Sequence, residues 1–148
     1  MTFNEVFQNK KPVIGMIHTD STDEFSMLDL AKKEIEIYLK YGVVPLIENY
    51  FGSAHDCAEV LEWMHSTHPE MIYGVNILGD KELAFELAHK YGAKFIQIDS
   101  VCGHLKPKDE QTYVSQLQEN REKYTVAVLG GVRFKYQPVR SGRSTEED

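Results

Sequence analysis

Short apolar runs alternate along the chain with longer amphipathic segments, and glycine or proline separates most of them. Five mostly apolar runs cover residues 13–17, 43–47, 71–75, 95–98 and 125–129; the first four lead directly into polar residues, and the fifth is followed by Gly130 and Gly131. Runs this short with few polar residues are typical of strands that are buried on both faces of a parallel sheet. The pattern therefore predicts five buried strands.

The segments between these runs have helical spacing and recognisable end signals. Three of them begin with a residue that can cap a helix, and these residues are Ser26, Ser53 and Asp80. Apolar residues then recur at intervals of three and four positions, and Gly42 and Gly92 stand where helices commonly end. A more polar segment, over about residues 108–123, predicts a fourth helix.

The spacing of the predicted strands matches repeated βα units. The strands start near residues 13, 43, 71, 94 and 125, and residues 41–49 resemble residues 91–99 in their order of helix end, glycine, strand and acidic residue. Right-handed crossovers between such units give a parallel sheet. Two α/β architectures fit: a five-stranded doubly wound sheet, or the first four to five units of a (β/α)₈ barrel, which needs about 250 residues when complete.

The final residues carry one more local signal. Residues 144–147 read Ser-Thr-Glu-Glu, which is the pattern of a capping box at the start of a helix. The segment is either the first turn of a further helix or an acidic disordered tail, and the pattern leaves both open.

Composition limits the classes of protein that remain. The 148 residues, 42% of them apolar, fit one domain with a single core over residues 1–148. The net charge of −7 argues against nucleic acid or a membrane surface as the partner. Cys57 and Cys102 have no metal-binding spacing, and no stretch approaches the ~20 apolar residues of a membrane span. We therefore expect a cytoplasmic protein with reduced thiols and no membrane insertion.

Polar side chains follow the predicted strands at their carboxyl ends. These residues are His18, Glu48, Asn49, Asn76, Asp99 and Lys135. Function collects at this end of parallel α/β folds because the loops converge there. A histidine, carboxylates, amides and a lysine can together support acid–base chemistry and the binding of phosphate or carbonyl groups. The alternative for Asn49, Asn76 and Asp99 is a role in capping local turns.

No motif in the sequence requires a metal or a cofactor. His18 with Glu48 or Asp99, and with His104 nearby, could ligate zinc or manganese, but no HxH or HExxH spacing supports such a site. The phosphate-binding patterns GxxxxGK[ST] and GxGxxG are absent. We expect neither a metal nor a cofactor, and we interpret Cys57 as a core residue.

Several segments resemble the BtpA family of (β/α)₈-barrel proteins. Residues 13–18, Val-Ile-Gly-Met-Ile-His, are similar to its opening "viGviHl" strand, and residues 47–52, Ile-Glu-Asn-Tyr-Phe-Gly, are similar to its "iENfgd" motif. Residues 74–80 resemble its "GvnvLrNd" segment, and residues 132–136 stand where the family has a strand that ends in "vKH". The resemblance covers about residues 12–139.

This resemblance implies a TIM barrel rather than a doubly wound sheet. It also implies a set of site residues, which are His18, Glu48, Asn49, Asn76, Asp80 and Lys135. The family is named for a role in photosystem I biogenesis, and its members are sometimes likened to phosphoribosylanthranilate isomerase. The chain departs from the family pattern where Gly79 and Gln97 replace arginines and where Tyr136 replaces a histidine.

The sequence thus predicts a barrel enzyme for a small phosphorylated sugar or nucleoside-type metabolite, with isomerase-like chemistry. His18 and Glu48 are its expected acid and base, and Lys135 is expected to stabilise an anion. The expected substrate-binding residues are Asn49, Asn76, Asp80 and Asp99. The alternatives are a non-catalytic assembly or regulatory protein of the BtpA type, or a truncated barrel that acts only as a homo-oligomer.

Overall fold

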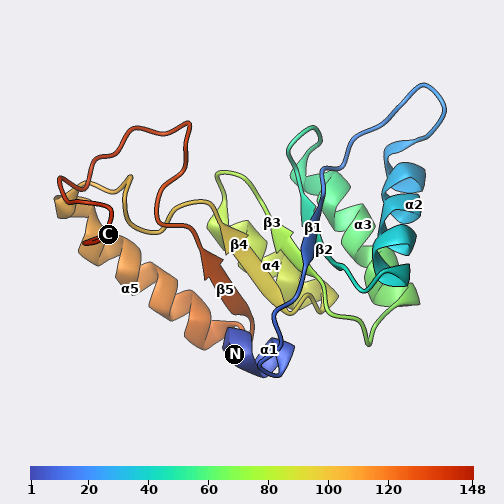
Figure 1. Cartoon of the computed structure of the whole chain (residues 1–148), viewed down its shortest axis with the longest axis horizontal. Coiled ribbons are helices and arrows are strands. Elements are labelled where there is room, and N and C mark those ends of the chain that lie inside the picture. Colours follow the sequence, from blue (N-terminus) through green and yellow to red (C-terminus); the bar gives the residue numbers. More distant parts are fainter.

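The computed structural model describes residues 1–148 and contains one five-stranded parallel sheet (Figure 1). The strands are β1 (Ile14–Ile17), β2 (Val44–Glu48), β3 (Gly74–Asn76), β4 (Phe95–Ile98) and β5 (Ala127–Gly130). The helices are α1 (Phe3–Phe7), α2 (Met27–Lys40), α3 (Ala54–Thr67), α4 (Lys81–Tyr91) and α5 (Pro107–Lys123). No helix combines the length and apolar character that a membrane crossing requires.

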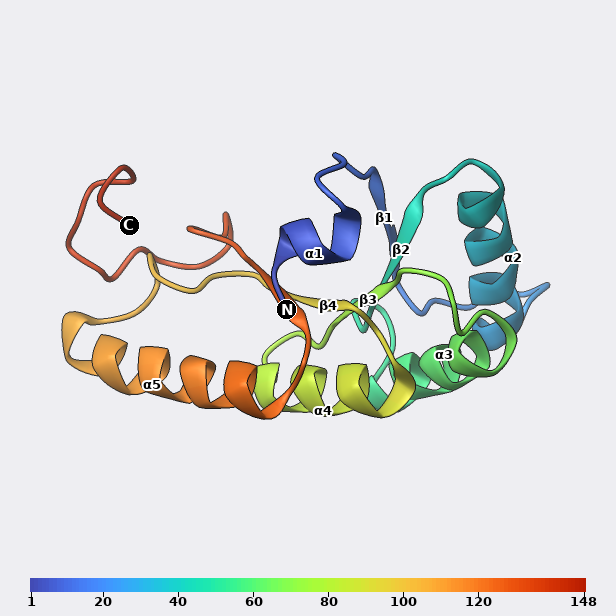
Figure 2. The ribbon, with the colours of Figure 1, turned by 90° about the horizontal axis from the view of Figure 1, so that it is seen from below.

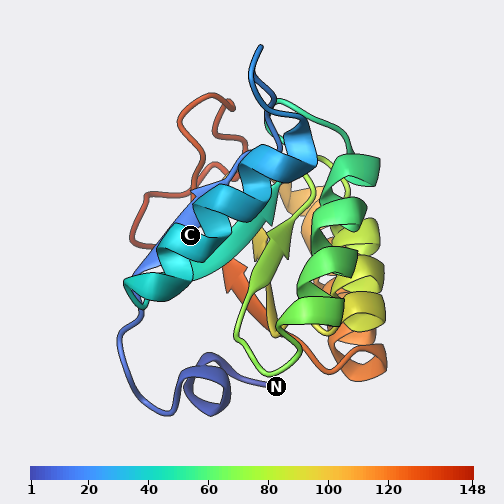
Figure 3. The same cartoon turned by 90° about the vertical axis from the view of Figure 1, so that its right-hand side faces the viewer.

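The order of the strands decides between the two architectures. Each strand pairs with the next one along the chain, all in parallel, so that the order is β1-β2-β3-β4-β5. Figures 2 and 3 show α3, α4 and α5 together on one face of the sheet and α1 alone on the other. A doubly wound sheet reverses its strand order and carries helices on both faces. The chain therefore has the arrangement of the first four to five βα units of a (β/α)₈ barrel, as predicted.

Local capping explains where the helices begin. The Ser53 hydroxyl accepts a hydrogen bond from the Asp56 backbone N–H at 3.2 Å, and the Asp56 carboxylate accepts from the Ser53 N–H at 2.6 Å. Ser26 and Asp80 cap α2 and α4 in the predicted positions. Gly92 ends α4 with a φ of 78°, a left-handed conformation that glycine adopts without steric cost.

The two faces of the sheet contribute to two separate cores. Ile17, Ile47, Val75 and Ile96 face the helices and belong to a cluster of 21 buried residues. On the opposite face, Met16, Leu46, Gly74, Phe95 and Ala127 stand in register across the five strands. We call these five residues the apolar row.

Helix α1 covers the apolar row, and the sequence pattern did not predict it. Val6 and Phe7 of α1 are buried in one cluster with Leu46, Phe95 and Ala127. The Thr2 hydroxyl and the Glu5 side chain form a complete capping box that starts this short helix. Helix α1 therefore closes the amino-terminal end of this face, and the opposite end of the face stays accessible.

Two segments differ from the simplest interpretation of the sequence. The third strand contains only residues 74–76, because the ladder with β4 starts where Gly74 aligns with Phe95. The run before it still belongs to the core, and Tyr73 is fully buried. Residues 144–147 form a turn in which the Ser144 N–H donates to the Glu147 carboxylate at 2.8 Å. The capping pattern therefore forms, and it starts one turn of the chain.

Candidate functional site

A row of polar residues lies directly above the apolar row, at the carboxyl ends of the strands. His18, Glu48, Asn76 and Gln97 each follow a member of the apolar row by two positions. Residues two apart on a strand point to the same face, so these four side chains share the inner face with the apolar row. We call them, together with Asp99, the polar row.

The closest charged contact in the polar row joins His18 and Glu48. The His18 Nε2 atom lies 3.3 Å from the Glu48 Oε2 atom. The Glu48 side chain is only 7% exposed, whereas the His18 side chain is 42% exposed. Burial raises the pKa of the Glu48 carboxyl, and the charge of Asp99 adds to this effect, although His18 and a hydrogen bond from Asn76 oppose it. The pair combines a fixed, buried carboxyl with an imidazole that a ligand can reach.

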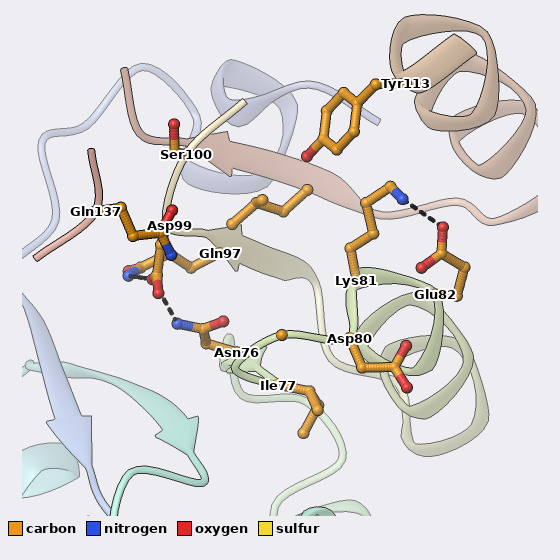
Figure 4. Close-up of a pocket in the computed structure, with 12 residues that line it drawn as sticks. Asn76, Ile77, Asp80, Lys81, Glu82, Gln97, Asp99, Ser100, Tyr113 and Gln137 are labelled. Carbon is orange, nitrogen blue, oxygen red and sulfur yellow. Dashed lines mark hydrogen bonds and ion pairs between the residues drawn. The ribbon is translucent and has the colours of Figure 1, made fainter. Parts of the chain in front are cut away.

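Asn76 holds the two carboxylates of the polar row in place. Its Nδ2 atom donates to Glu48 Oε1 at 2.8 Å and to Asp99 Oδ1 at 3.1 Å. Figure 4 shows the amide beside Asp99. Because a primary amide has two N–H groups, one side chain can satisfy both carboxylates at once. Asn76 is thus engaged across three strands and does not cap a local turn.

Two further residues support Glu48 and the loop beside it. The buried Thr19 has a φ of 49°, which is uncommon for a β-branched residue, and its hydroxyl donates to the Glu48 carbonyl at 3.0 Å. The Asn49 Oδ1 atom accepts from the Leu78 N–H at 2.7 Å and so ties the ends of β2 and β3 together. Asn49 therefore joins two neighbouring loops, and neither Asn49 nor Asn76 caps a local turn.

Aromatic rings surround the exposed side of His18. The imidazole lies 5.4 Å from the Tyr50 ring and 5.9 Å from the Phe51 ring, measured between ring centroids. Tyr50 and Phe51 themselves meet edge to face at 4.7 Å. These contacts limit the orientations that the imidazole can adopt beside Glu48.

The polar row opens into a cavity of about 550 Å³. The polar and aromatic residues that line it include His18, Glu48, Tyr50, Gln97, Asp99 and Lys135. A volume of this size lies within the range of ordinary small-molecule sites. The structure thus brings the three predicted catalytic residues to one cavity.

Lys135 reaches this cavity from a loop. The sequence pattern had instead placed it at the end of a strand. Strand β5 ends at Gly130, and the chain then turns before it reaches Lys135. The His104 ring holds this loop: its Nδ1 atom lies 2.9 Å from the Pro138 carbonyl, and its Nε2 atom accepts from the Phe134 N–H at 2.5 Å. His104 therefore positions the loop and does not lie with His18, Glu48 and Asp99 as a common ligand set.

A second, smaller cavity of about 220 Å³ continues from the first between α4 and α5 (Figure 4). Asp80, Lys81, Ser100 and Tyr113 are among the residues that line it. The Asp80 Oδ1 atom also accepts from the Leu83 N–H at 3.0 Å as the cap of α4. The predicted residue Asp80 therefore lies in this smaller cavity, away from the contact between His18 and Glu48.

The remaining candidates for chemistry have structural roles. No group of three or more His, Cys, Asp or Glu side chains is arranged to hold a metal ion. Cys57 is fully buried in the main core, and burial raises the pKa of its thiol to about 12, so it packs as an apolar residue.

Comparison with known proteins adds one similar structure. No family pattern and no curated protein matches the sequence. The fold is similar to the crystal structure of 7,8-dihydropteroate synthase from Vibrio fischeri ES114, with a TM-score of 0.49 and 19% sequence identity. The match covers 81% of this chain and 44% of that protein, so the chain spans less than half of the length of the protein that it resembles. Membership of the BtpA family stays a prediction.

Proposed function

We propose that the cavity above the polar row is the active site of a barrel enzyme that performs acid–base chemistry on a small phosphorylated sugar or nucleoside-type metabolite. The observation that supports this proposal is the contact of 3.3 Å between His18 and Glu48, in which one partner is buried and the other is accessible. Pairs of titratable groups in unlike environments are typical of acid–base sites.

The proposed reaction is an isomerisation through an enediol. The Glu48 carboxylate removes a proton from the carbon next to the substrate carbonyl, and its raised pKa makes it a stronger base. Protonated His18 donates a proton to the carbonyl oxygen. The carbon–hydrogen bond breaks as the carbon–carbon double bond forms. Glu48 then returns its proton to the former carbonyl carbon, while His18, now neutral, takes the proton of the other enediol hydroxyl, which becomes the new carbonyl.

The other predicted residues have distinct parts in this scheme. Lys135 lines the same cavity and supplies the positive charge for the anionic group of the substrate. Asn76 and Asp99 orient Glu48, since Asn76 joins the two carboxylates. Asn49 acts through the loop that it ties to Leu78, and Asp80 contributes to the smaller cavity.

Deuterium exchange tests this function without knowledge of the final product. A panel of sugar phosphates that includes ribose 5-phosphate is incubated with the protein in heavy water, and deuterium at the carbon next to the carbonyl is measured by mass spectrometry. We expect exchange with the parent protein and a loss of at least about a hundredfold in His18→Ala and in Glu48→Gln, because general acid–base catalysis contributes about that much.

A matched control separates catalysis from folding. His55 lies on α3 with a side chain that is 82% exposed, so His55→Ala makes the same chemical change away from the cavity. We expect His55→Ala to exchange deuterium at the parent rate, and circular dichroism confirms that all the variants fold. Equal exchange rates in His18→Ala, Glu48→Gln and the parent would refute the assignment.

The open edges of the sheet favour a second feature, self-association. β1 pairs only with β2, and β5 pairs only with β4, so each outer strand presents an unpaired edge. Ile14, Met16, Val44 and Leu129 on the inner face are only partly buried. We propose that the chain forms a homo-oligomer, and the non-catalytic assembly role of the BtpA type is the alternative that the same edges favour.

Light scattering tests the association directly. We expect a mass above 17.0 kDa that increases with protein concentration. A constant monomer mass at high concentration would contradict self-association, and it would leave the deuterium exchange test unaffected.

A further inference from the structure

The smaller cavity between α4 and α5 is continuous with the proposed active site. Gly79, Gln97, Asp99 and Gln137 line both cavities. A ligand whose reactive carbon lies beside His18 and Glu48 can therefore extend past Asp99 into the smaller cavity. At about 220 Å³ the smaller cavity is too small for a complete ligand site of ordinary size, and it suits one part of a larger molecule.

The charges that line the smaller cavity do not favour an anionic group. Its one cation, Lys81, forms an ion pair with Glu82. Asp80 and Asp99 add two carboxylates, both already engaged with N–H groups of the chain. A phosphate placed here would meet negative charge and no unpaired cation. The cation that is available to a phosphate, Lys135, lines the larger cavity instead.

Neutral polar groups face the smaller cavity and have capacity for new hydrogen bonds. The Tyr113 hydroxyl points into the space in Figure 4 and makes no hydrogen bond within the chain. The side chain of Gln137 lies at the opposite wall and is also without a partner in the chain. Ser100 donates to the Val132 carbonyl at 3.1 Å, which leaves its oxygen free to accept. Burial raises the pKa of Tyr113, so its hydroxyl stays protonated and remains a donor.

We propose that the smaller cavity binds the uncharged, hydroxyl-bearing part of the substrate, a pentose or a similar polyol, with Tyr113 and Gln137 as its hydrogen-bonding partners. This inference rests on the proposed function, since it assigns the orientation of the same substrate. Each sugar hydroxyl both donates and accepts, which matches a wall of one phenol, one amide and one hydroxyl. The anionic group then points toward Lys135.

Protein-observed NMR with three probes tests the ligand class. The ¹⁵N-labelled chain is titrated with D-ribose, with D-ribose 5-phosphate and with inorganic phosphate alone. We expect both sugars to shift the backbone amides of Gly79, Lys81 and Ser100, and phosphate alone to leave these amides unchanged. Shifts of the same amides by phosphate alone, or no shift with either sugar, would overturn the proposal.

Variants of Tyr113 and Gln137 test the proposed hydrogen-bonding partners of the sugar. Tyr113→Phe removes only the hydroxyl and should weaken D-ribose binding about three- to tenfold, the value of one hydrogen bond. Tyr41→Phe makes the same change at a tyrosine that is 72% exposed at the end of α2, and it should bind ribose as the parent does. Gln137→Ala, in an exposed loop, gives a second measurement if Tyr113→Phe does not fold. Parent-like affinity in both cavity variants would overturn the assignment.

The outcome separates this inference from the proposed function. His18→Ala removes the proposed acid, yet it should leave the ribose-dependent shifts in the smaller cavity intact. If these shifts depend on Tyr113 but no substrate exchanges deuterium, the polyol site stands and the enzymatic proposal fails. If deuterium exchange occurs and ribose never reaches the smaller cavity, the enzymatic proposal stands and the polyol site fails.

Discussion

The inner face of the sheet has an apolar half and a polar half, although the same strands run through both. The lower half, toward the amino-terminal ends of the strands, is the apolar row, where Phe95 and Leu46 are fully buried beneath α1. The upper half is the polar row, where Glu48 and Asn76 are buried to nearly the same extent, at 5% and 2% exposure. Burial is therefore not what separates the two halves.

The difference between them lies in what burial does to each kind of side chain. An apolar side chain gains stability when it leaves water, whereas a buried carboxylate loses hydration and must be compensated by hydrogen bonds. The amide of Asn76 supplies that compensation to both Glu48 and Asp99. The lower half therefore stabilises the sheet, and the upper half holds reactive groups at some cost in stability.

Phe95→Ala should have the largest effect, because it removes the central side chain of the apolar row. The ring is fully buried and fills the space above Gly74, where an added Cβ atom would overlap it. We expect the free energy of unfolding to fall by about 3–5 kcal/mol, the usual result of a large cavity. Urea denaturation measures this, with Phe51→Ala, at a ring that is 62% exposed, as the control. Equal losses in both variants would contradict the comparison.

Asn76→Ala should have an intermediate effect, because it removes the group that compensates the polar row. Glu48 and Asp99 would then lose a shared donor while both stay close together. We expect the free energy of unfolding to fall by about 1–3 kcal/mol at neutral pH. The loss should shrink in mild acid, where protonation removes the repulsion. Asn4→Ala, at an exposed position of α1, is the control, and a loss that is independent of pH would count against this account.

Glu48→Gln should have the smallest effect on stability, and it should not lower the free energy of unfolding as the two substitutions above do. The raised pKa of Glu48 means that the folded chain holds this proton more tightly than the unfolded chain. The stability that this proton contributes is complete below the ordinary pKa of a glutamic acid, and it is lost as the pH rises through the folded value. Glu48→Gln should therefore be at least as stable as the parent at neutral pH.

Thermal unfolding over a pH series measures this effect. The parent should lose stability from the ordinary pKa of glutamic acid upward, and Glu48→Gln should lose less over the same interval. Glu62→Gln, at an exposed position of α3, should behave as the parent does. A steeper pH dependence in Glu48→Gln than in the parent would show that burial does not control this carboxyl.

The sequence predicted the strands and the larger helices because their signals are local. Caps such as Ser53 and buried runs such as the one that ends at Glu48 depend only on neighbouring residues. Helix α1 has an equally local capping box at Thr2, but it spans only five residues, too few for a helical periodicity of apolar residues to show. The pattern of strand ends also indicated that His18 and Glu48 would meet, since they end adjacent strands.

Other parts of the site depend on register and on loops, which the sequence pattern does not specify. Gln97 belongs to the polar row but lies inside β4, so a search for residues after the strands passes over it. The bridge from Asn76 to two carboxylates requires the relative positions of three strands. The position of Lys135 depends on His104, about thirty residues earlier, whose ring contacts its loop on both sides.

The two cysteines lie in unequal environments, so the unmodified protein can be labelled at one of them. Cys57 is fully buried and its thiol has a pKa of about 12, so an alkylating reagent does not reach it in the folded chain. Cys102 is partly exposed, and its Sγ atom lies 3.5 Å from the carbonyl of Val132 in the segment that leads to the Lys135 loop. A maleimide fluorophore should therefore attach at a single position of the unmodified protein. Its emission would report changes in the segment that leads to the Lys135 loop without any engineered residue.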